Sequence, residues 1–455
     1  MQKANTANIP TILAILGATG DLTAKKIVPS LHHIFRHRHL PTMFRVVGFS
    51  RQNLSDESFR GRVREAVERH HAGTGRTPPK LDEFLGLFSY TQGDFTNVRG
   101  FGDLKGALDA VDREWGVCTN KLFYLAAPPQ FYEAIFKNLA ASRLTEPCSP
   151  EEGWTRVIVE KPFGKDLKTA EALDGLLGKL FREVQIYRID HYLGKEMVQN
   201  MITFRFANNL FERDWGKDLI ERIDVRILEK IGVEERGDFY DGVGALRDVG
   251  QNHLLQMLAL VTMAHPVDFR SDAIRARREE ILKSLRVFSK EETQVRTFRG
   301  QYEGYRAAEG VSPQSTTETY FKIRAELETP RWQGVPVILE GGKCMDQDAK
   351  EVVVTFRHPA PCLCPPDAKE HLKNRLVIHL SGREGITVQF WSKKPGITMD
   401  LEERSLDFFF KGADEDRPYA EAYEKLLVDC IRGDQTLFVS GGEVSAMWKF
   451  IDPIV

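Results

Sequence analysis

Short apolar runs alternate with segments of helical periodicity over residues 10–190. Residues 11–16 are continuously apolar, which is typical of a strand buried on both faces of a parallel sheet. Later runs share this character, namely residues 45–50, 122–126, 156–160 and 186–189. Because strands separated by helices predict βαβ units, we expect an α/β Rossmann-like dinucleotide-binding domain over residues 1–195.

The pattern changes beyond residue 200. Residues 220–229 alternate apolar and charged positions, which predicts an antiparallel strand, and residues 245–263 predict a helix with a broad apolar face. Further strands are predicted at residues 318–325, 335–340, 351–356, 376–380 and 385–390, and further helices at 271–284 and 419–431. We therefore expect an α+β C-terminal domain with a large, mostly antiparallel sheet over residues 196–455.

Composition narrows the class of protein. The chain has 455 residues and a net charge of -2, so no basic excess predicts a nucleic-acid partner. The polar N-terminus lacks the apolar core of a signal peptide, and no apolar run is long enough to span a bilayer. We expect a cytoplasmic protein whose cysteines are reduced and which does not bind a membrane. Cys362 and Cys364 lack the second pair of a zinc site, so no metal is expected.

A glycine-containing loop follows the first predicted strand directly. Gly17 and Gly20 lie in the sequence GATGDLTAKK, and a helical pattern begins after them. Strand, glycine turn and helix is the arrangement that places a pyrophosphate at a helix N-terminus. The spacing is not the full G-x-G-x-x-G, so an ordinary tight turn remains an alternative.

The end of the second predicted strand indicates which dinucleotide is bound. NAD-binding folds place an acidic residue there for the ribose 2′-hydroxyl, whereas this chain has Ser50, Arg51 and Gln52. A guanidinium can form two hydrogen bonds with a 2′-phosphate, which a carboxylate would repel. Arg51 therefore favours NADP over NAD, unless it only begins a solvated loop.

Two further segments concentrate residues that suit an anionic substrate. Lys161 follows the strand at residues 156–160, at the sheet edge where cofactor and substrate bind in such folds. In the stretch RIDHYLGKE (residues 188–196), Lys195 offers charge to a phosphate and His191 and Tyr192 offer directional hydrogen bonds. A solvated turn capped by Asp190 is the alternative interpretation of this stretch.

Oxidation of an alcohol also needs a base that takes the hydroxyl proton while the hydride leaves carbon. His191 and His253 are the candidates, and His253 lies near Asp248 on a predicted helix. Asp190 could hold the other ring nitrogen, which would fix the tautomer and raise basicity. From the residues alone we predict an NADP-linked oxidoreductase that acts on an anionic alcohol.

Several motifs then occur in an order typical of one family. They are GATGDLTAKK, EKPFG, RIDHYLGKE, RDVGQNHLLQ, RWQGVPV, the GGK ending at Lys343, and LLVDCIRGDQTLF. RIDHYLGKE followed by RDVGQNHLLQ is the most specific pair. In these motifs the chain resembles the glucose-6-phosphate dehydrogenase family over nearly its whole length.

The resemblance implies oxidation of D-glucose 6-phosphate to 6-phospho-D-glucono-1,5-lactone, the first oxidative step of the pentose phosphate pathway. It implies His253 as general base and Asp190 as its supporting carboxylate. The implied substrate-binding residues are Lys161, His191, Tyr192, Lys195, Glu229, Asp248 and Lys343. The implied NADP-binding residues are Gly17, Ala18, Thr19, Gly20, Asp21, Leu22, Arg51, Tyr124, Lys161 and Pro162. Homodimers or homotetramers joined through the large sheet are implied as well.

The chain also departs from the family's pattern. It stops at Val455, where the family usually continues, so we do not predict a second, structural NADP. Glu340 and Gly341 precede the Gly342-Lys343 pair where the family often has Arg or Thr, and the run Asp346–Asp348 replaces an expected basic residue. Thr19 and Gln52 leave NAD open as a second acceptor.

Two other functions remain open. The segment EKP followed by an antiparallel second domain also resembles the glucose–fructose oxidoreductase-like sugar dehydrogenases, which act on unphosphorylated sugars. RIDHYLGKE and RDVGQNHLLQ count against that family. A non-catalytic NADP-binding or scaffold protein is the other alternative, and the retention of Asp190, His253, Lys195 and Lys161 counts against it.

Overall fold

The computed structural model describes residues 10–72, 78–148, 152–208, 212–358, 361, 373–410 and 420–455. By proximity of Cα atoms, the chain forms two compact units. Unit 1 comprises residues 1–164, 168–194 and 420–441, and unit 2 comprises residues 165–167, 195–419 and 442–455. The chain passes from unit 1 to unit 2 between residues 194 and 195, one residue before the predicted boundary. The return of residues 420–441 to unit 1 is a feature that the sequence pattern does not predict.

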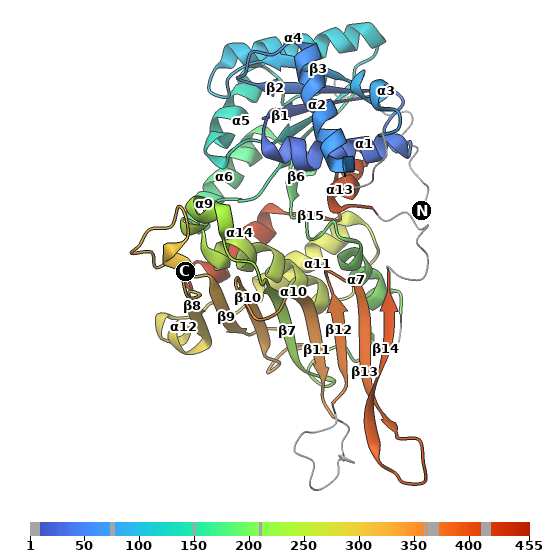
Figure 1. Cartoon of the computed structure of the whole chain (residues 1–455), viewed down its shortest axis with the longest axis vertical. Coiled ribbons are helices and arrows are strands. Elements are labelled where there is room, and N and C mark those ends of the chain that lie inside the picture. Colours follow the sequence, from blue (N-terminus) through green and yellow to red (C-terminus); the bar gives the residue numbers. More distant parts are fainter. Residues whose placement is uncertain are drawn as a thin grey trace. The chain divides into compact units, whose positions relative to one another are not determined.

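Unit 1 contains a seven-stranded sheet in the order β15-β6-β5-β4-β1-β2-β3 (Figure 1). Its strands are β1 (Thr11–Leu16), β2 (Phe44–Ser50), β3 (Phe88–Gln92), β4 (Asn120–Leu125), β5 (Thr155–Val159), β6 (Ile186–Ile189) and β15 (Phe438–Val439). The first six pair in parallel and β15 joins β6 antiparallel. Every residue of β1 and β4 is buried, because both faces of the sheet are covered.

The helices of unit 1 follow the strands as predicted. They are η2 (Thr23–Ile27), α1 (Val28–Arg36), α2 (Asp56–His71), α3 (Leu81–Leu85), α4 (Val98–Trp115), α5 (Tyr132–Ala141), α6 (Leu167–Leu180) and, from the end of the chain, α13 (Ala422–Arg432). Arg156 on β5 anchors α13 by donating to the carbonyls of Cys430 (2.6 Å) and Ile431 (2.9 Å). Those carbonyls belong to the last turn of the helix, where a cation is favourable.

Unit 2 contains an eight-stranded sheet in the order β14-β13-β12-β11-β7-β10-β9-β8 (Figure 1). Its strands are β7 (Ile220–Leu228), β8 (Thr297–Gly300), β9 (Tyr320–Ala325), β10 (Val337–Gly342), β11 (Ala349–Phe356), β12 (Arg375–His379), β13 (Gly385–Lys393) and β14 (Leu401–Phe409). The predicted strand at 220–229 is antiparallel to β11 but parallel to β10, so the prediction was only partly right. All other pairings within this sheet are antiparallel.

Helices pack against the sheet of unit 2 and supply its core. They are α7 (Glu196–Phe206), α9 (Gly237–Asp241), η7 (Leu246–Leu254), α10 (Leu255–Thr262), α11 (Ser271–Lys283), α12 (Lys290–Arg296) and α14 (Gly441–Ile451). Every residue of α10 is buried, and η7 packs against β7 and β10. The predicted helix at 245–263 is thus a π-helical segment, η7, continued by an α-helix. Among the described residues, no helix combines the length and apolarity needed to cross a membrane.

The prediction that all cysteines are reduced was wrong for one pair. Cys118 and Cys148 form a disulfide, with their Cα atoms 6.2 Å apart. Cys118 precedes β4 and Cys148 lies in the connection that leads to β5, and these strands are neighbours in the sheet. Cys344 and Cys430 are free, while Cys362 and Cys364 lie outside the described residues.

Candidate active site

The glycine loop lies at the carboxyl end of β1, directly before η2 and α1. Gly17 has φ of +103°, and a Cβ atom there would lie 2.2 Å from the carbonyl oxygen of Ala126. Position 17 therefore requires glycine for both conformation and close backbone approach. The backbone N–H groups of Gly17 and Ala18 donate to the carbonyl of Phe49, which joins the loop to the end of β2.

The other residues of the glycine loop differ in their contacts and in their exposure. Thr19 donates to the hydroxyl of Ser50 at 3.1 Å, and Gly20 N–H donates to the carbonyl of Gly17. Leu22 is partly exposed. Asp21 is exposed and pairs with Lys25 at 2.8 Å, an ion pair that lowers the pKa of Asp21.

Arg51 lies exposed immediately after β2, where the predicted NADP selectivity places it. The adjacent hydroxyl of Ser50 contacts that of Tyr90 at 2.9 Å, and Tyr90 also donates to the carbonyl of Ser50. These bonds fix the backbone from which Arg51 projects. This position carries an exposed guanidinium side chain in place of the acidic residue of NAD-binding folds.

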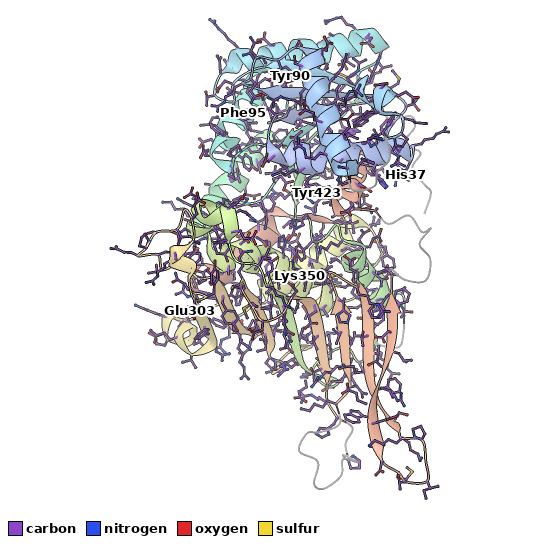
Figure 2. The ribbon with its side chains drawn as sticks, in the orientation of Figure 1. His37, Tyr90, Phe95, Glu303, Lys350 and Tyr423 are labelled. Carbon is purple, nitrogen blue, oxygen red and sulfur yellow. A yellow bond between two sulfur atoms is a disulfide. The ribbon has the colours of Figure 1, made fainter. Side chains whose placement is uncertain are left out.

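Glu160, which follows β5, is held by tyrosines from three segments of unit 1. Tyr124 of β4 is fully buried and donates to Glu160 Oε1 at 2.5 Å, and Tyr132 of α5 donates to the Glu160 carbonyl at 3.1 Å. Tyr423 of α13, labelled in Figure 2, hydrogen-bonds the same carboxylate. Burial raises the pKa of Glu160 to about 6, against the lowering effect of the bonds from Tyr124 and Tyr423.

Lys161 and Pro162 follow Glu160 and are joined to each other by a cis peptide bond. Both side chains are at least partly exposed. The hydroxyl of Tyr124, a residue predicted to bind NADP, donates to Glu160. We therefore interpret Tyr124 as support for the residue that precedes Lys161.

The stretch RIDHYLGKE follows β6 in a compact turn. Asp190 is 1% exposed, and its Oδ1 accepts from the backbone N–H of Tyr192 at 3.0 Å. His191 stacks on Tyr423, with ring centroids 6.4 Å apart and an interplanar angle of 10°. A Cβ atom at Gly194 would lie 2.8 Å from the carbonyl of Ala422, so this glycine permits the approach of α13. Tyr423 thereby contacts both Glu160 and His191.

In unit 2, one carboxylate is shared by two lysines. Glu229 follows β7, and its two oxygens lie 2.7 Å from Lys343 Nζ and 2.7 Å from Lys350 Nζ. Burial would raise the pKa of Glu229, but the bonds from Lys343 and Lys350 lower it to about 2. Lys350, labelled in Figure 2, is a candidate site residue that the sequence analysis missed.

A small cavity joins three of the predicted substrate-binding residues. It is lined by Ile227, Glu229, Tyr240, Ala245, Asp248, Val249, Gly342 and Lys343. Lys343 Nζ lies 5.5 Å from the ring centroid of the buried Tyr240, a cation–π geometry. Burial, together with the negative charge of Asp248, raises the pKa of Tyr240.

The helix that carries Asp248 and His253, η7, is capped at its first residue. Glu318 accepts from the backbone N–H of Leu246 at 2.9 Å and so caps η7. In a π-helix the hydrogen bonds join residues five apart, so Asp248 and His253 lie one turn from each other on η7. His253 is 1% exposed, and its backbone N–H donates to Asn252 Oδ1 at 2.6 Å.

Both departures near Lys343 have structural explanations. Glu340 accepts from Tyr320 at 2.6 Å and lies near Arg226 and Lys322, so its charge is balanced within the sheet. Asp348 is exposed and accepts from the backbone N–H of Lys230. A side chain at Gly341 would collide with Phe321, at 2.6 Å from an added Cβ.

Unit 1 thus brings together Glu160, Lys161 and the stretch 190–194, while unit 2 brings together Glu229, Asp248 and Lys343. Lys195 lies in unit 2 at the start of α7 and donates to the carbonyl of Leu380 at 3.0 Å. Tyr423 and Lys350 were missed because no local pattern marks them. Their positions depend on the return of residues 420–441 and on the register of β11 with β7.

We predict that Lys350→Met destabilises the protein at pH 7 by about 1–2 kcal/mol, because partly buried Glu229 loses one of two charged hydrogen bonds. Lys322→Met is the matched control. It removes a half-exposed lysine that lies 3.6 Å from Glu340, and should cost under about 0.5 kcal/mol. Urea unfolding midpoints measure both. Equal effects of the two substitutions would contradict the assignment.

We predict a pH-dependent effect of Glu160→Gln. The folded-state pKa of about 6 lies above the ordinary 4.5, so ionised Glu160 lowers stability above pH 6 and this cost disappears as the pH falls toward 4.5. Relative to the unaltered chain, Glu160→Gln should therefore gain about 1 kcal/mol between pH 5 and pH 7.5. Unfolding midpoints at the two pH values test this, with exposed Glu114→Gln as control. A stability difference that does not change with pH would refute it.

Both units match family models of known proteins. Residues 14–200 match the model "Glucose-6-phosphate dehydrogenase, NAD binding domain" and residues 202–455 match "Glucose-6-phosphate dehydrogenase, C-terminal domain". Glucose-6-phosphate 1-dehydrogenase of Aggregatibacter actinomycetemcomitans is 38% identical over 453 residues, covering 97% of this chain and 90% of that protein.

Solved structures agree with this result. A glucose-6-phosphate dehydrogenase in complex with its substrate glucose-6-phosphate has a TM-score of 0.89 at 33% identity, covering 99% of this chain and 92% of the other. Glucose-6-phosphate 1-dehydrogenase from Mycobacterium avium has a TM-score of 0.83 at 32% identity, with 98% and 92% covered. The predicted fold class, a Rossmann-like domain with a mostly antiparallel α+β domain, is confirmed. The chain belongs to the glucose-6-phosphate dehydrogenase family.

Proposed function

We propose that this chain oxidises D-glucose 6-phosphate to 6-phospho-D-glucono-1,5-lactone and reduces NADP. The observation that carries the proposal is similarity over 97% of the chain to a glucose-6-phosphate 1-dehydrogenase. The two family models together span residues 14–200 and 202–455, which counts against the unphosphorylated-sugar alternative.

The residues at the carboxyl edge of unit 1 fit a dinucleotide. Gly17 leaves no room for a side chain, so a pyrophosphate can approach the backbone where the following helix begins. Exposed Arg51 can pair with a 2′-phosphate, which supports NADP as the preferred cofactor and leaves NAD as a possible second acceptor. When bound, NADP supplies the acceptor for the hydride.

His253 is the proposed general base. Its imidazole would take the proton of the C1 hydroxyl while the hydride leaves C1, and the proposed role of Asp190 is to support the imidazole once it is charged. A rigid π-helical turn and a capped helix start hold His253 and Asp248 in fixed positions. This preorganisation suits a residue that must transfer a proton in one defined direction.

The remaining site residues are proposed to hold the anionic sugar. His191, Tyr192 and Lys195 would bind the phosphate, and Glu229 and Asp248 would accept from sugar hydroxyls. Lys161 would lie between sugar and nicotinamide, beside Pro162. Lys343 would bind the substrate as well. Lys350 would then keep Glu229 ionised when Lys343 turns from that carboxylate to the substrate, which the shared geometry of Glu229 supports.

We also propose a homodimer or homotetramer in the cytoplasm. Support for association comes from β14, an edge strand whose Leu406 and Phe408 are 65% and 55% exposed. Exposed apolar side chains on an edge strand favour burial against another chain.

The direct test is the absorbance of reduced nicotinamide with purified protein, glucose 6-phosphate and either NADP or NAD. We expect rapid reduction of NADP, slower or comparable reduction of NAD, and no reduction with free glucose. Reduction that occurs with glucose but not with its 6-phosphate would overturn the proposal.

We predict that His253→Asn lowers kcat by about 10²–10⁴-fold, with little change in substrate affinity, because the base acts only in the transition state. His265→Asn, also in unit 2, removes a histidine whose ring contacts the Pro266 carbonyl and Phe206, and should leave kcat unchanged. Steady-state kinetics and calorimetric binding of glucose 6-phosphate measure the two effects. A fall in kcat of less than tenfold would exclude His253 as the base.

A further inference from the structure

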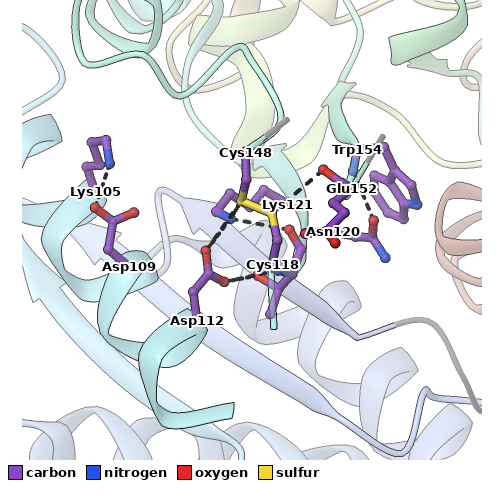
Figure 3. Close-up of a disulfide and its surroundings, with 10 residues drawn as sticks. Lys105, Asp109, Asp112, Cys118, Asn120, Lys121, Cys148, Glu152 and Trp154 are labelled. Atoms are coloured by element: carbon purple, nitrogen blue, oxygen red, sulfur yellow. Dashed lines mark hydrogen bonds and ion pairs between the residues drawn. A yellow bond between two sulfur atoms is a disulfide. The ribbon is translucent and has the colours of Figure 1, made fainter. Parts of the chain in front are cut away.

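The disulfide of unit 1 lies in a charged setting that structural disulfides do not need (Figure 3). Cys148 is exposed and Cys118 is partly exposed. The ammonium of Lys121 lies 3.6 Å from Cys148 Sγ, although the Lys121 side chain is only 8% exposed. A buried cation in contact with an exposed sulfur is the environment that stabilises a thiolate.

Lys121 is held in this position by Asp112, near the end of α4. Lys121 Nζ lies 2.8 Å from Asp112 Oδ2 and 3.2 Å from the Thr119 carbonyl. Asp112 Oδ1 accepts from both the N–H and the hydroxyl of Thr119. The carboxylate therefore has its own donors and fixes the lysine beside the sulfur (Figure 3). Asp112 Oδ2 itself lies 3.7 Å from Cys148 Sγ, so both a cation and an anion contact this sulfur.

The same atoms could be read as a metal site, since Asp112, Cys118 and Cys148 offer three ligand atoms within 4.8 Å of one another. Lys121 makes that interpretation less favourable, because its ammonium lies among the ligand atoms and would repel a cation. A dithiol that exchanges with a disulfide fits the charges better.

We propose that Cys118 and Cys148 form a thiol–disulfide exchange site whose electron donor is a dithiol. A thiolate of the donor attacks exposed Cys148 Sγ, the Cys118–Cys148 bond breaks, and Cys118 leaves and takes a proton. The donor's second thiol then attacks its own sulfur in the mixed disulfide, and Cys148 leaves as a thiolate beside Lys121. The donor becomes a disulfide and the chain a dithiol, with two electrons transferred.

The position of the pair connects it to the edge where the cofactor is proposed to bind. Cys118 precedes β4 and Cys148 lies in the connection to β5, and these two strands pair from Lys121 and Thr155 to Leu125 and Val159. The disulfide ties their amino ends, and the Tyr124–Glu160 bond joins their carboxyl ends. Reduction removes one of these two links.

The experiment uses the full chain and dithiothreitol buffers of defined oxidised-to-reduced ratio. Peptide mass spectrometry should show a Cys118–Cys148 link that disappears in one two-electron transition. In the reduced protein at pH 7, iodoacetamide should alkylate Cys148 at least tenfold faster than Cys344, the exposed free cysteine.

Variants separate the role of Lys121 from simple exposure. Lys121→Met should slow alkylation of Cys148 to the rate of Cys344 or below. Lys105→Met is the control and should not slow it, because Lys105 pairs with Asp109 on α4, the helix that also carries Asp112. Asp112→Asn removes the negative charge that lies 3.7 Å from Cys148 Sγ and should speed alkylation of Cys148, so the test holds even if Lys121→Met folds poorly.

Three results would overturn the proposal. The first is no Cys118–Cys148 link in oxidising buffer, and the second is alkylation of Cys148 no faster than that of Cys344. The third is protection of both cysteines by added Zn²⁺, which would indicate a metal site instead.

Discussion

A single carboxylate, that of Glu160, sets the arrangement of the carboxyl edge of unit 1. A buried carboxylate requires hydrogen-bond donors, and here they come from Tyr124 on β4 and Tyr423 on α13. Tyr423 also stacks on His191. The residue before the proposed cofactor-contacting lysine and the proposed phosphate-binding histidine are thus positioned by one side chain. Removing Tyr124 or Tyr423 would take one of these two donors from the Glu160 carboxylate.

In unit 2 a partly buried carboxylate, that of Glu229, is stabilised by lysines instead of tyrosines. Glu229 is kept ionised by Lys343 and Lys350, from the loop after β10 and from β11. The Asp346–Asp348 run, which replaces an expected basic residue, leads into the strand that delivers Lys350. Lys350 thus places a second positive charge beside Glu229, although the run before it carries none.

Local features of the sequence were sufficient for much of this architecture. The glycine loop, the parallel strands and the position of Arg51 after β2 could be predicted because strand, turn and helix signals lie within a few residues of each other. Tyr423 and Lys350 could not, because their contacts depend on chain return and strand register. The π-helical form of η7 was also invisible, since its apolar positions suit an ordinary helix. The disulfide pairs cysteines 30 residues apart that only the sheet brings together.

The return of residues 420–441 to unit 1 has a consequence for the order of folding during synthesis. The ribosome releases β1 to β6 early, yet β15 and α13 emerge only after β7 to β14 of unit 2. Until then β6 is an open sheet edge and Glu160 lacks one of its tyrosines, a state prone to association with other chains. A nascent nucleotide-binding unit that is completed only after the strands of the other unit is expected to depend on chaperones while β6 stays open.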